Sequence, residues 1–240
     1  MKNYKLLFCS ALLLLPILLL GQDLRYAPQN KGVLIENTYY CLDFNEEHKQ
    51  PNWVYYMLTQ SHFTGKAARS STFKDCKQGG VESAKQSDYK GSGYDKGHLC
   101  PAADMTLSTE AMKETFQMWN VSPQVPAFNR GRWANLEALV RGYIKTESDT
   151  LFVVTGPVFI SNQGTIGKSN VTVPSYFYKV VYSPTRGGIG FLMPNQRISS
   201  KLQSWQTSIE LIEVLTGIDF FPQLPKEVQA KIESQVVWWD

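Results

Sequence analysis

The sequence predicts an α+β domain built on a mostly antiparallel sheet. Strand-like runs come first, helical stretches follow, and further strand-like runs come after them, without a regular alternation of strand and helix. The composition is typical of a globular protein, with 43% hydrophobic and 19% charged residues and no low-complexity tract or internal repeat. A chain of 240 residues is long enough to bury one sizeable core.

The first 21 residues differ from the rest of the chain. Lys2 and Lys5 precede an apolar run from Leu6 to Leu20, and Gly21 follows it. This order is typical of a secretory signal peptide, whereas a membrane anchor needs about 20 apolar residues. We therefore expect residues 1–21 to be a signal peptide, the mature chain to be secreted or periplasmic, and no membrane attachment after cleavage.

Export changes the charge and the cysteine count. Without Lys2 and Lys5 the formal net charge falls from +3 to +1, so a polyanion must be bound by a local cleft rather than by the field of the whole protein. Cys41, Cys76 and Cys100 remain, and an oxidising compartment permits one disulfide between two of them. The sequence does not decide which pair forms.

The N-terminal half predicts strands and a long loop. Residues 22–38 are polar and mixed, which indicates a loosely held N-terminal arm before a single domain over residues 39–240. The aromatic-rich runs TYYCLDFN (38–45) and NWVYYMLT (52–59) predict adjacent strands joined by a polar turn. Residues 64–93 are rich in glycine, serine and lysine, which is typical of a loop, and its length indicates a functional one.

The C-terminal half predicts helices that flank further strands. The stretch STEAMKETFQMW predicts a helix with Ser108 as its N-cap. A second helix begins near Asn129, because apolar residues recur at helical spacing at positions 133, 136, 140 and 143. Three strand-like runs follow between Thr150 and Asn195, and residues 201–217 predict a closing amphipathic helix. We expect Trp53, Trp133 and Trp205 to be core residues.

The stretch YDKGHLCPAADM places His98 after an acid, a base and a glycine. Histidine is the side chain best suited to move a proton near neutral pH. Lys96 next to it and Arg69 in the glycine-rich loop could hold a phosphate, and Gly97 would let the backbone pass close to a ligand. The residues alone leave open a plain surface pair of lysine and histidine.

The stretch NVSPQVPAFNRGRWANLE adds Asn120, Asn129 and Glu137. At about 100° per residue, the directions of Asn129 and Glu137 around a helix differ by only about 80°. An amide oxygen and a carboxylate can hold a hard cation such as Mg²⁺ that keeps most of its waters. A plain N-cap is the alternative role for Asn129.

Four motifs together resemble a known family. YDKGHLCPAADM, WNVSPQVPAFNRGRWANLE, VVTGPVF and VTVPSYFYKVVY occur in order, and they resemble the DNA/RNA non-specific endonucleases, the group that contains Serratia nuclease and mitochondrial endonuclease G. The resemblance runs from about Tyr39 to Phe221. It implies a ββα-metal nuclease core, in which a strand pair carries the histidine and a helix carries the metal ligand, on the antiparallel sheet with flanking helices.

The resemblance also implies roles for the polar residues. His98 matches the general base, and Asn129 matches the direct protein ligand of Mg²⁺ (or Mn²⁺). Glu137 matches a glutamate that acts on the cation through water. Asn120 matches an active-site asparagine that supports the geometry of the histidine and the phosphate.

Three further residues complete the implied substrate site. Arg69 matches an arginine that stabilises the charged phosphate, and Asp95 matches the supporting acid that opens the histidine motif. Lys96 stands where the family usually has arginine. The positive charge is kept, but the planar two-pronged contact with phosphate oxygens is lost.

These observations predict an exported, metal-dependent endonuclease that cuts both DNA and RNA and leaves 5′-phosphate ends. One alternative is a catalytically weak nucleic-acid-binding relative, which only Lys96 supports. A second is a phosphodiesterase for a small substrate, which a shallow or closed cleft would indicate. The sequence leaves open whether the protein forms a homodimer and which inhibitor protein, if any, binds it.

Other candidate centres are weaker. A zinc nuclease of the HNH type needs further histidines, and none follows His98. Cys100 has only that one histidine nearby, so a thiol nucleophile is disfavoured. His48 and His62 are expected to be solvated or structural.

Overall fold

The computed structural model of the protein describes residues 23–146, 148–161 and 163–239. The predicted signal peptide, residues 1–21, therefore lies outside the described residues. Within the described ranges, no helix combines the length and the apolar character that crossing a membrane requires.

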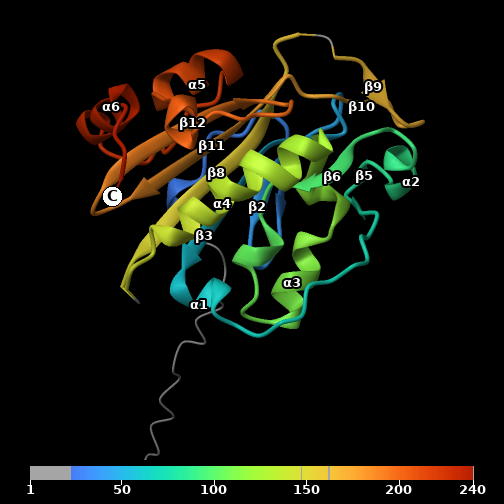
Figure 1. The fold of residues 1–240 in the computed structure, drawn as a ribbon, viewed down its shortest axis with the longest axis horizontal. Helices are drawn as coiled ribbons and strands as arrows, with labels where there is room; N and C mark the ends of the chain where they lie inside the picture. The colour runs from blue at the N-terminus through green and yellow to red at the C-terminus, as the bar shows by residue number, and fades with distance from the viewer. Residues whose placement is uncertain (1–22, 147, 162, 240) are drawn as a thin grey trace, which may run out of the picture.

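A seven-stranded sheet forms the centre of the molecule (Figure 1). Every neighbouring pair of its strands is antiparallel, which confirms the predicted sheet type. Its strands, in order across the sheet, are β1 (Val33–Glu36), β2 (Cys41–Asn45), β3 (Gln50–Thr59), β8 (Thr150–Val158), β11 (Tyr176–Ser183), β12 (Gly187–Pro194) and β13 (Gln206–Thr207).

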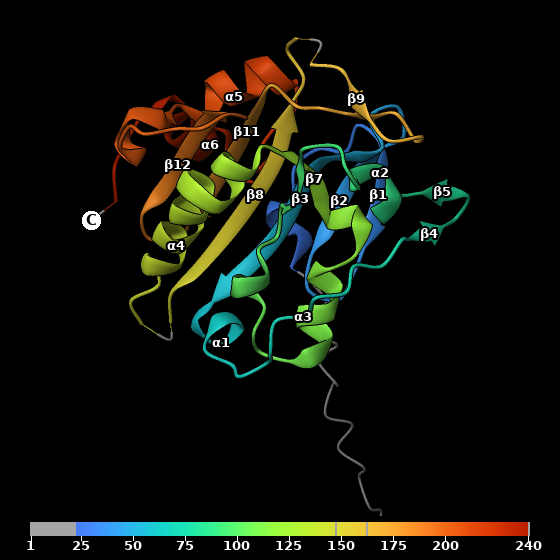
Figure 2. The same ribbon diagram turned by 45° about the vertical axis from the view of Figure 1, so that its right-hand side comes forward.

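Helices and loops cover both faces of this sheet (Figure 2). On β11, Phe177 and Val181 pack into the core that the sheet shares with α4, whereas Tyr178 and Val180 pack on the opposite face with α5 and α6. Because successive side chains point to opposite faces, this central strand is apolar almost throughout. The α-helices are α1 (Gln60–Phe63), α2 (Gln86–Tyr89), α3 (Thr109–Thr115), α4 (Ala134–Gly142), α5 (Ile209–Thr216) and α6 (Lys226–Ser234).

A separate strand pair lies on the α4 side of the sheet and leads into a helix. Strand β6 (Asp95–His98) pairs antiparallel with β7 (Val121–Gln124), and His98 lies opposite Val121. A π-helical segment, η4 (Phe128–Trp133), follows β7 and continues into α4. The chain thus contains the ββα unit that the resemblance implied.

Two smaller strand pairs and four 3₁₀ segments complete the fold. The pairs are β4 (Lys77–Gln78) with β5 (Val81–Glu82), and β9 (Thr165–Ile166) with β10 (Val171–Thr172). The 3₁₀ segments are η1 (Leu24–Tyr26), η2 (Ala102–Asp104), η3 (Met118–Asn120) and η5 (Leu202–Trp205).

Of the segment predicted as a loosely held arm, residues 22–38, the described residues 23–38 are attached to the sheet. Residues Val33–Glu36 form the edge strand β1, which pairs with β2. Before it, the carbonyl oxygens of Asp23 and Gln29 accept hydrogen bonds from Tyr55 Oη (2.5 Å) and Trp53 Nε1 (3.1 Å). The prediction was wrong here because contacts with distant strands, not local sequence, hold this segment.

The closing helix is shorter than the predicted span of 201–217. Residues 202–205 form η5, and β13 then pairs with β12 at the sheet edge. Helix α5 begins after Ser208, whose Oγ accepts a hydrogen bond from the Leu211 backbone N–H (3.2 Å), and ends at Gly217 in the left-handed conformation. Trp205 is only partly buried, whereas Trp53 and Trp133 are buried core residues as predicted.

The three cysteines of the described chain are free thiols. Cys41 and Cys100 are fully buried in the two cores that lie on opposite faces of the sheet. Cys76 is partly exposed. The disulfide that an oxidising compartment would permit is not present.

Candidate active site

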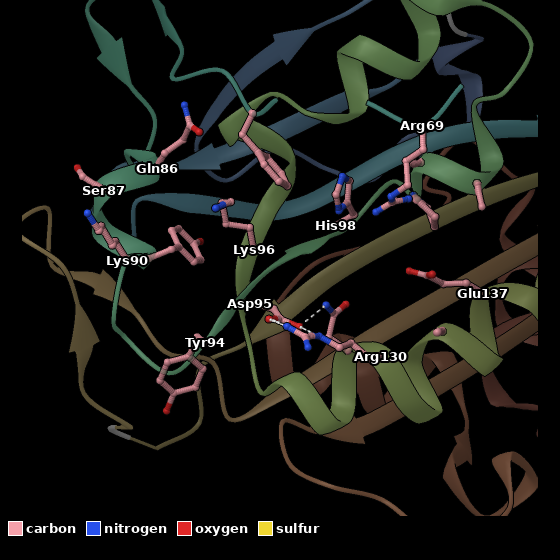
Figure 3. A pocket seen from close by; sticks show the side chains of 17 residues that line it. Arg69, Gln86, Ser87, Lys90, Tyr94, Asp95, Lys96, His98, Arg130 and Glu137 are labelled. Atoms are coloured by element: carbon pink, nitrogen blue, oxygen red, sulfur yellow. Dashed lines mark hydrogen bonds and ion pairs between the residues drawn. The ribbon is translucent and has the colours of Figure 1, made fainter. Parts of the chain in front are cut away.

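A cavity of about 800 Å³ opens beside the ββα unit (Figure 3). The loop before α2, strand β6, η4 and α4 all contribute to its wall. Six of the residues singled out from the sequence line it together: Arg69, Asp95, Lys96, His98, Asn129 and Glu137.

The His98 side chain is held in an aromatic cage. Its ring centroid lies 5.3 Å from that of Phe73 and 4.7 Å from that of Phe116. Burial, together with the positive charge of Arg69, lowers the pKa of His98 to about 3. The imidazole is therefore neutral at physiological pH, and its buried Nε2 has no hydrogen-bond partner among the described residues. A surface pair of lysine and histidine is excluded.

Two cations flank the caged histidine. The Arg69 guanidinium lies 5.2 Å from the ring centroid of Phe116, and Lys96 Nζ lies 4.9 Å from that of Phe73. The aromatic faces thus orient the cations as well as the base. In the described chain neither cation forms an ion pair with an acidic residue. Both charges are available to an anion in the cavity.

Asp95 orients Asn129 rather than facing the cavity as a free acid. Its Oδ2 accepts hydrogen bonds from Asn129 Nδ2 (2.9 Å) and Arg130 Nε (2.8 Å), and its Oδ1 accepts one from Arg130 Nη2 (2.6 Å). Burial favours a higher pKa for Asp95, but these hydrogen bonds and the Arg130 charge lower the pKa below its ordinary value. Asp95 is therefore ionised, and both of its oxygens accept hydrogen bonds from Asn129 or Arg130.

This arrangement also decides between the two roles considered for Asn129. The residue that precedes η4 as its N-cap is Ala127, so Asn129 is not the cap. Its amide nitrogen is used by Asp95, and no described residue donates to its Oδ1. The amide oxygen is left for a ligand in the cavity.

Glu137 lies on α4 at the other end of the cavity, above a buried group of charges. Burial raises its pKa to about 7, and the positive charge of Lys179 partly offsets this effect. Lys179 is fully buried, donates to Thr155 Oγ1 (2.6 Å), and lies 5.1 Å from the ring centroid of Trp133. A cation brought next to this carboxyl would favour its ionised form.

Asn120 lies outside the cavity wall. The residue is fully buried, its Oδ1 accepts from the Cys100 backbone N–H (2.7 Å), and its Nδ2 donates to the carbonyls of Cys100 (2.8 Å) and Thr115 (3.0 Å). Both ends of the amide are therefore occupied by backbone groups. Asn120 instead fixes the backbone two residues after His98.

Gly97 makes the strand pair possible. A Cβ atom at this position would lie 2.2 Å from the Cδ and Oε1 atoms of Gln124, which is fully buried on the opposite strand. The side chain of Gln124 fills the space that glycine leaves, so β6 and β7 can approach each other behind His98 and Lys96.

The donor set of the cavity fits a hard cation. Mg²⁺ prefers oxygen ligands and is usually bound through one or two protein groups while it keeps several waters. Asn129 offers an unoccupied amide oxygen, and Glu137 offers a carboxyl that a nearby cation would hold ionised. Asn129 would hold Mg²⁺ directly, and Glu137 would act from the far side of the cavity.

Sequence reasoning missed three residues of the site. Arg130 holds Asp95, and Phe73 and Phe116 enclose the base. Arg130 follows Asn129 directly, so its charge next to a candidate ligand was a usable signal. Nothing in the local sequence marks the two phenylalanines, because they lie 25 and 18 positions from the histidine along the chain.

The other two histidines have structural roles, as expected. His48 stacks on Phe159 with ring centroids 3.9 Å apart, and its Nδ1 lies 3.0 Å from Thr172 Oγ1. His62 Nδ1 lies 2.7 Å from Thr59 Oγ1. Neither lines the cavity.

A histidine on a strand pair, followed by a helix that carries an oxygen ligand, defines the ββα-metal class of nucleases. Residues 24–227 match the model of a family described as DNA/RNA non-specific endonuclease. The chain therefore belongs to the DNA/RNA non-specific endonuclease family and is a nucleic-acid-hydrolysing enzyme.

Similar proteins support this assignment. A nuclease of Nostoc sp. is 34% identical over 221 residues, which cover 85% of this chain and 78% of the relative. The mitochondrial endonuclease G of Bos taurus is 32% identical over 222 residues, covering 85% and 74%. A crystal structure of the EndoG/EndoGI complex aligns with a TM-score of 0.74 at 30% identity and covers 82% of this chain and 89% of the other.

Proposed function

We propose that the protein is an exported, Mg²⁺- or Mn²⁺-dependent endonuclease that hydrolyses DNA and RNA to 5′-phosphate ends. One observation carries the proposal: a neutral, caged His98 shares a cavity with two unpaired cations and an unoccupied amide oxygen. A base, phosphate-binding cations and a metal ligand are the groups that hydrolysis of a phosphodiester needs.

The base acts first. His98 accepts a proton from water through its free Nε2, and the resulting hydroxide attacks phosphorus. The bond from phosphorus to the 3′ oxygen breaks, that oxygen takes a proton from solvent, and the products carry 5′-phosphate and 3′-hydroxyl ends. The ribose 2′-hydroxyl takes no part, so DNA and RNA are both substrates.

The low pKa of His98 explains why the imidazole is unprotonated before substrate binds, and the charge of the substrate explains how the imidazole can then accept a proton. In the free enzyme the low pKa keeps the imidazole in its proton-accepting form. A bound phosphodiester places negative charge near the ring and favours the imidazolium, which raises the basicity of His98 only when substrate is present.

Charged side chains hold the phosphate during the reaction. Arg69 and Lys96 approach from the two sides of the base, and each is already oriented by an aromatic ring. Positive groups fixed in advance stabilise the charge that develops on the phosphate oxygens. Mg²⁺, when bound, supplies further stabilisation of that charge, and Asp95 and Arg130 keep Asn129 in position to hold it.

A second cavity next to the one around the base favours a polymer over a small substrate. About 800 Å³ lies around the base, and a second cavity of about 500 Å³ shares two of its lining residues, Ser87 and Lys90. Two adjoining cavities contrast with the single closed cleft that we would expect in a phosphodiesterase for a small substrate. This arrangement supports the endonuclease.

Plasmid and RNA cleavage by purified residues 22–240 tests the proposal. We expect cutting of both with Mg²⁺, loss with EDTA, and a rate about 10²–10⁴-fold lower in His98→Ala. His62→Ala is the matched control and should cut normally, since His62 lies outside the cavity. Folded protein that cuts neither nucleic acid with Mg²⁺ or Mn²⁺ would contradict the proposal.

A signal peptide, and hence export, is tested separately. We expect the chain expressed in a bacterial host to appear in the periplasm or medium with Gln22 at its N-terminus. N-terminal sequencing of the mature protein checks this, and an intact Met1 would contradict it.

A further inference from the structure

The cavity around His98 continues beyond the candidate active site. The second cavity, of about 500 Å³, lies between α2, the turn after it and the hairpin formed by β9 and β10. Ser87 and Lys90 of this region line both cavities, so the two cavities adjoin each other at α2. Figure 3 shows both residues on the side of His98 away from Glu137.

The hairpin is seated firmly on α2. The buried Asp88 accepts hydrogen bonds from the backbone N–H groups of Ser169 (3.1 Å) and Lys85 (2.8 Å), one on each carboxylate oxygen. Gly167 has a φ of +67°, and a Cβ there would lie 2.2 Å from Asp88 Cβ, so only glycine permits this approach. The loop that carries Lys168 is thereby held next to α2.

The accessible charge of the second cavity is positive. Lys90 and Lys168 line it and are exposed, and neither side chain has a hydrogen-bond or ion-pair partner within the part of the chain that the structure describes. Asp88 is the one acidic residue in the lining, and its oxygens are occupied by backbone N–H groups. An anion is the ligand that this surface fits.

We propose that Lys90 and Lys168 bind backbone phosphates of the substrate strand outside the bond that is cut, so that the strand runs from His98 across α2 to the β9–β10 hairpin. This inference rests on the proposed nuclease function. A nucleic acid carries one such charge per nucleotide, and the net charge of the mature chain is too small to attract it as a whole. The two lysines act as substrate-positioning residues and favour strands longer than a few nucleotides.

Salt dependence of binding measures these contacts. Binding of a single strand of about 20 nucleotides to His98→Ala, which binds without cutting, is followed by fluorescence anisotropy at several salt concentrations. Adding Lys90→Ala and Lys168→Ala should weaken binding about three- to tenfold and reduce the slope of log K against log salt by about 1.4, because each contact with a single strand contributes about 0.7. Lys226→Ala, an exposed lysine on α6, is the control and should leave the slope unchanged.

Cleavage kinetics of the double lysine variant that keeps His98, compared with the wild type, give a second readout. With both lysines replaced, we expect KM for the long strand to rise about three- to tenfold while kcat stays within twofold. An unchanged salt slope and KM in the double variant, or equal losses for Lys226→Ala, would overturn the inference alone. Absence of cleavage by wild-type protein would overturn the nuclease function instead, and the binding slope would still decide whether the lysines contact the strand.

Discussion

The two sides of the active-site cavity treat charge in opposite ways. His98 is enclosed by Phe73 and Phe116 and kept neutral. On the other side, Asp95 stays ionised through hydrogen bonds with Asn129 and with an Arg130 side chain that is 73% exposed. The comparison shows how one cavity can provide an apolar environment for the base and a polar environment for the proposed cation ligand. Burial lowers the pKa of a histidine base and keeps it unprotonated, whereas a hard cation keeps several waters and needs oxygen ligands held in place.

The largest loss of cleavage activity should come from removing the Asn129 amide, the proposed metal ligand. We expect Asn129→Ala to lower the cleavage rate at least about 10³-fold, more than the usual loss from a residue behind the ligand. Mn²⁺ binding, followed by electron paramagnetic resonance, should weaken in parallel. Asn135→Ala, at an exposed position of α4, is the control; equal loss in both variants would contradict a specific role for Asn129.

A smaller loss should follow from removing the support behind that ligand. Asp95→Asn should lower activity about 10- to 100-fold, and excess Mg²⁺ should restore part of it. Because the Arg130 partner is 73% exposed, although the Asp95 side chain is only 17% exposed, the free energy of unfolding should change by only about 1 kcal/mol. Denaturant unfolding beside Mg²⁺ titrations separates the two effects, and a large drop in stability would show a structural role instead.

The burial of His98 in its aromatic cage should be measurable in the pH dependence of the free energy of unfolding. The folded pKa of His98, about 3, lies below its ordinary value of 6.5, so between these values the unfolded state binds a proton that the folded state does not. Stability is therefore lost as pH falls through this window, by up to ~1.4 kcal/mol per pH unit.

His98→Gln removes this term while Glu137, whose raised pKa acts in the opposite direction, stays in both proteins. We expect unfolding free energies measured between pH 6 and pH 4 to fall less steeply in the variant than in the wild type. Parallel slopes would mean that the aromatic cage does not exclude the proton.

The smallest expected effect concerns the cation beside the base. Lys96→Arg should raise kcat/KM about two- to tenfold, because a guanidinium can make two parallel contacts with phosphate oxygens. Lys113→Arg, at an exposed position on α3, should leave the rate unchanged. A lower rate in Lys96→Arg would indicate that the ring of Phe73 accepts only the ammonium group in this place.

The periodicity of apolar residues in the sequence predicted the strands and helices whose conformation depends on neighbouring residues in the chain. The long apolar runs that became β8 and β11, and the buried stripe of α4, follow directly from side-chain periodicity. The histidine, its neighbouring cation and the asparagine that we propose as a metal ligand were identified through residue chemistry and ordered motifs. Each of these signals lies within a few consecutive residues.

Features that depend on distant partners were not predictable in this way. Residues 206–207 form a strand because β12 offers them its edge, although the surrounding sequence is helical in pattern. The two carbonyl partners and one N–H partner of Asn120, through which it holds the backbone after His98, come from the folded structure and could not be predicted from the local sequence. The pairing of Asp95 with Arg130 joins residues 35 positions apart, which no local pattern reports.

Gly97 and Gln124 have a consequence for how this enzyme can change. The glutamine occupies the volume that a side chain at position 97 would need, so the two positions form one unit across the strand pair. A larger residue at 97 would force the Gln124 side chain to move, and a smaller residue at 124 would leave a void in its place. The effect of a substitution at either position should therefore depend on which residue occupies the other, as is usual for side chains that share one volume.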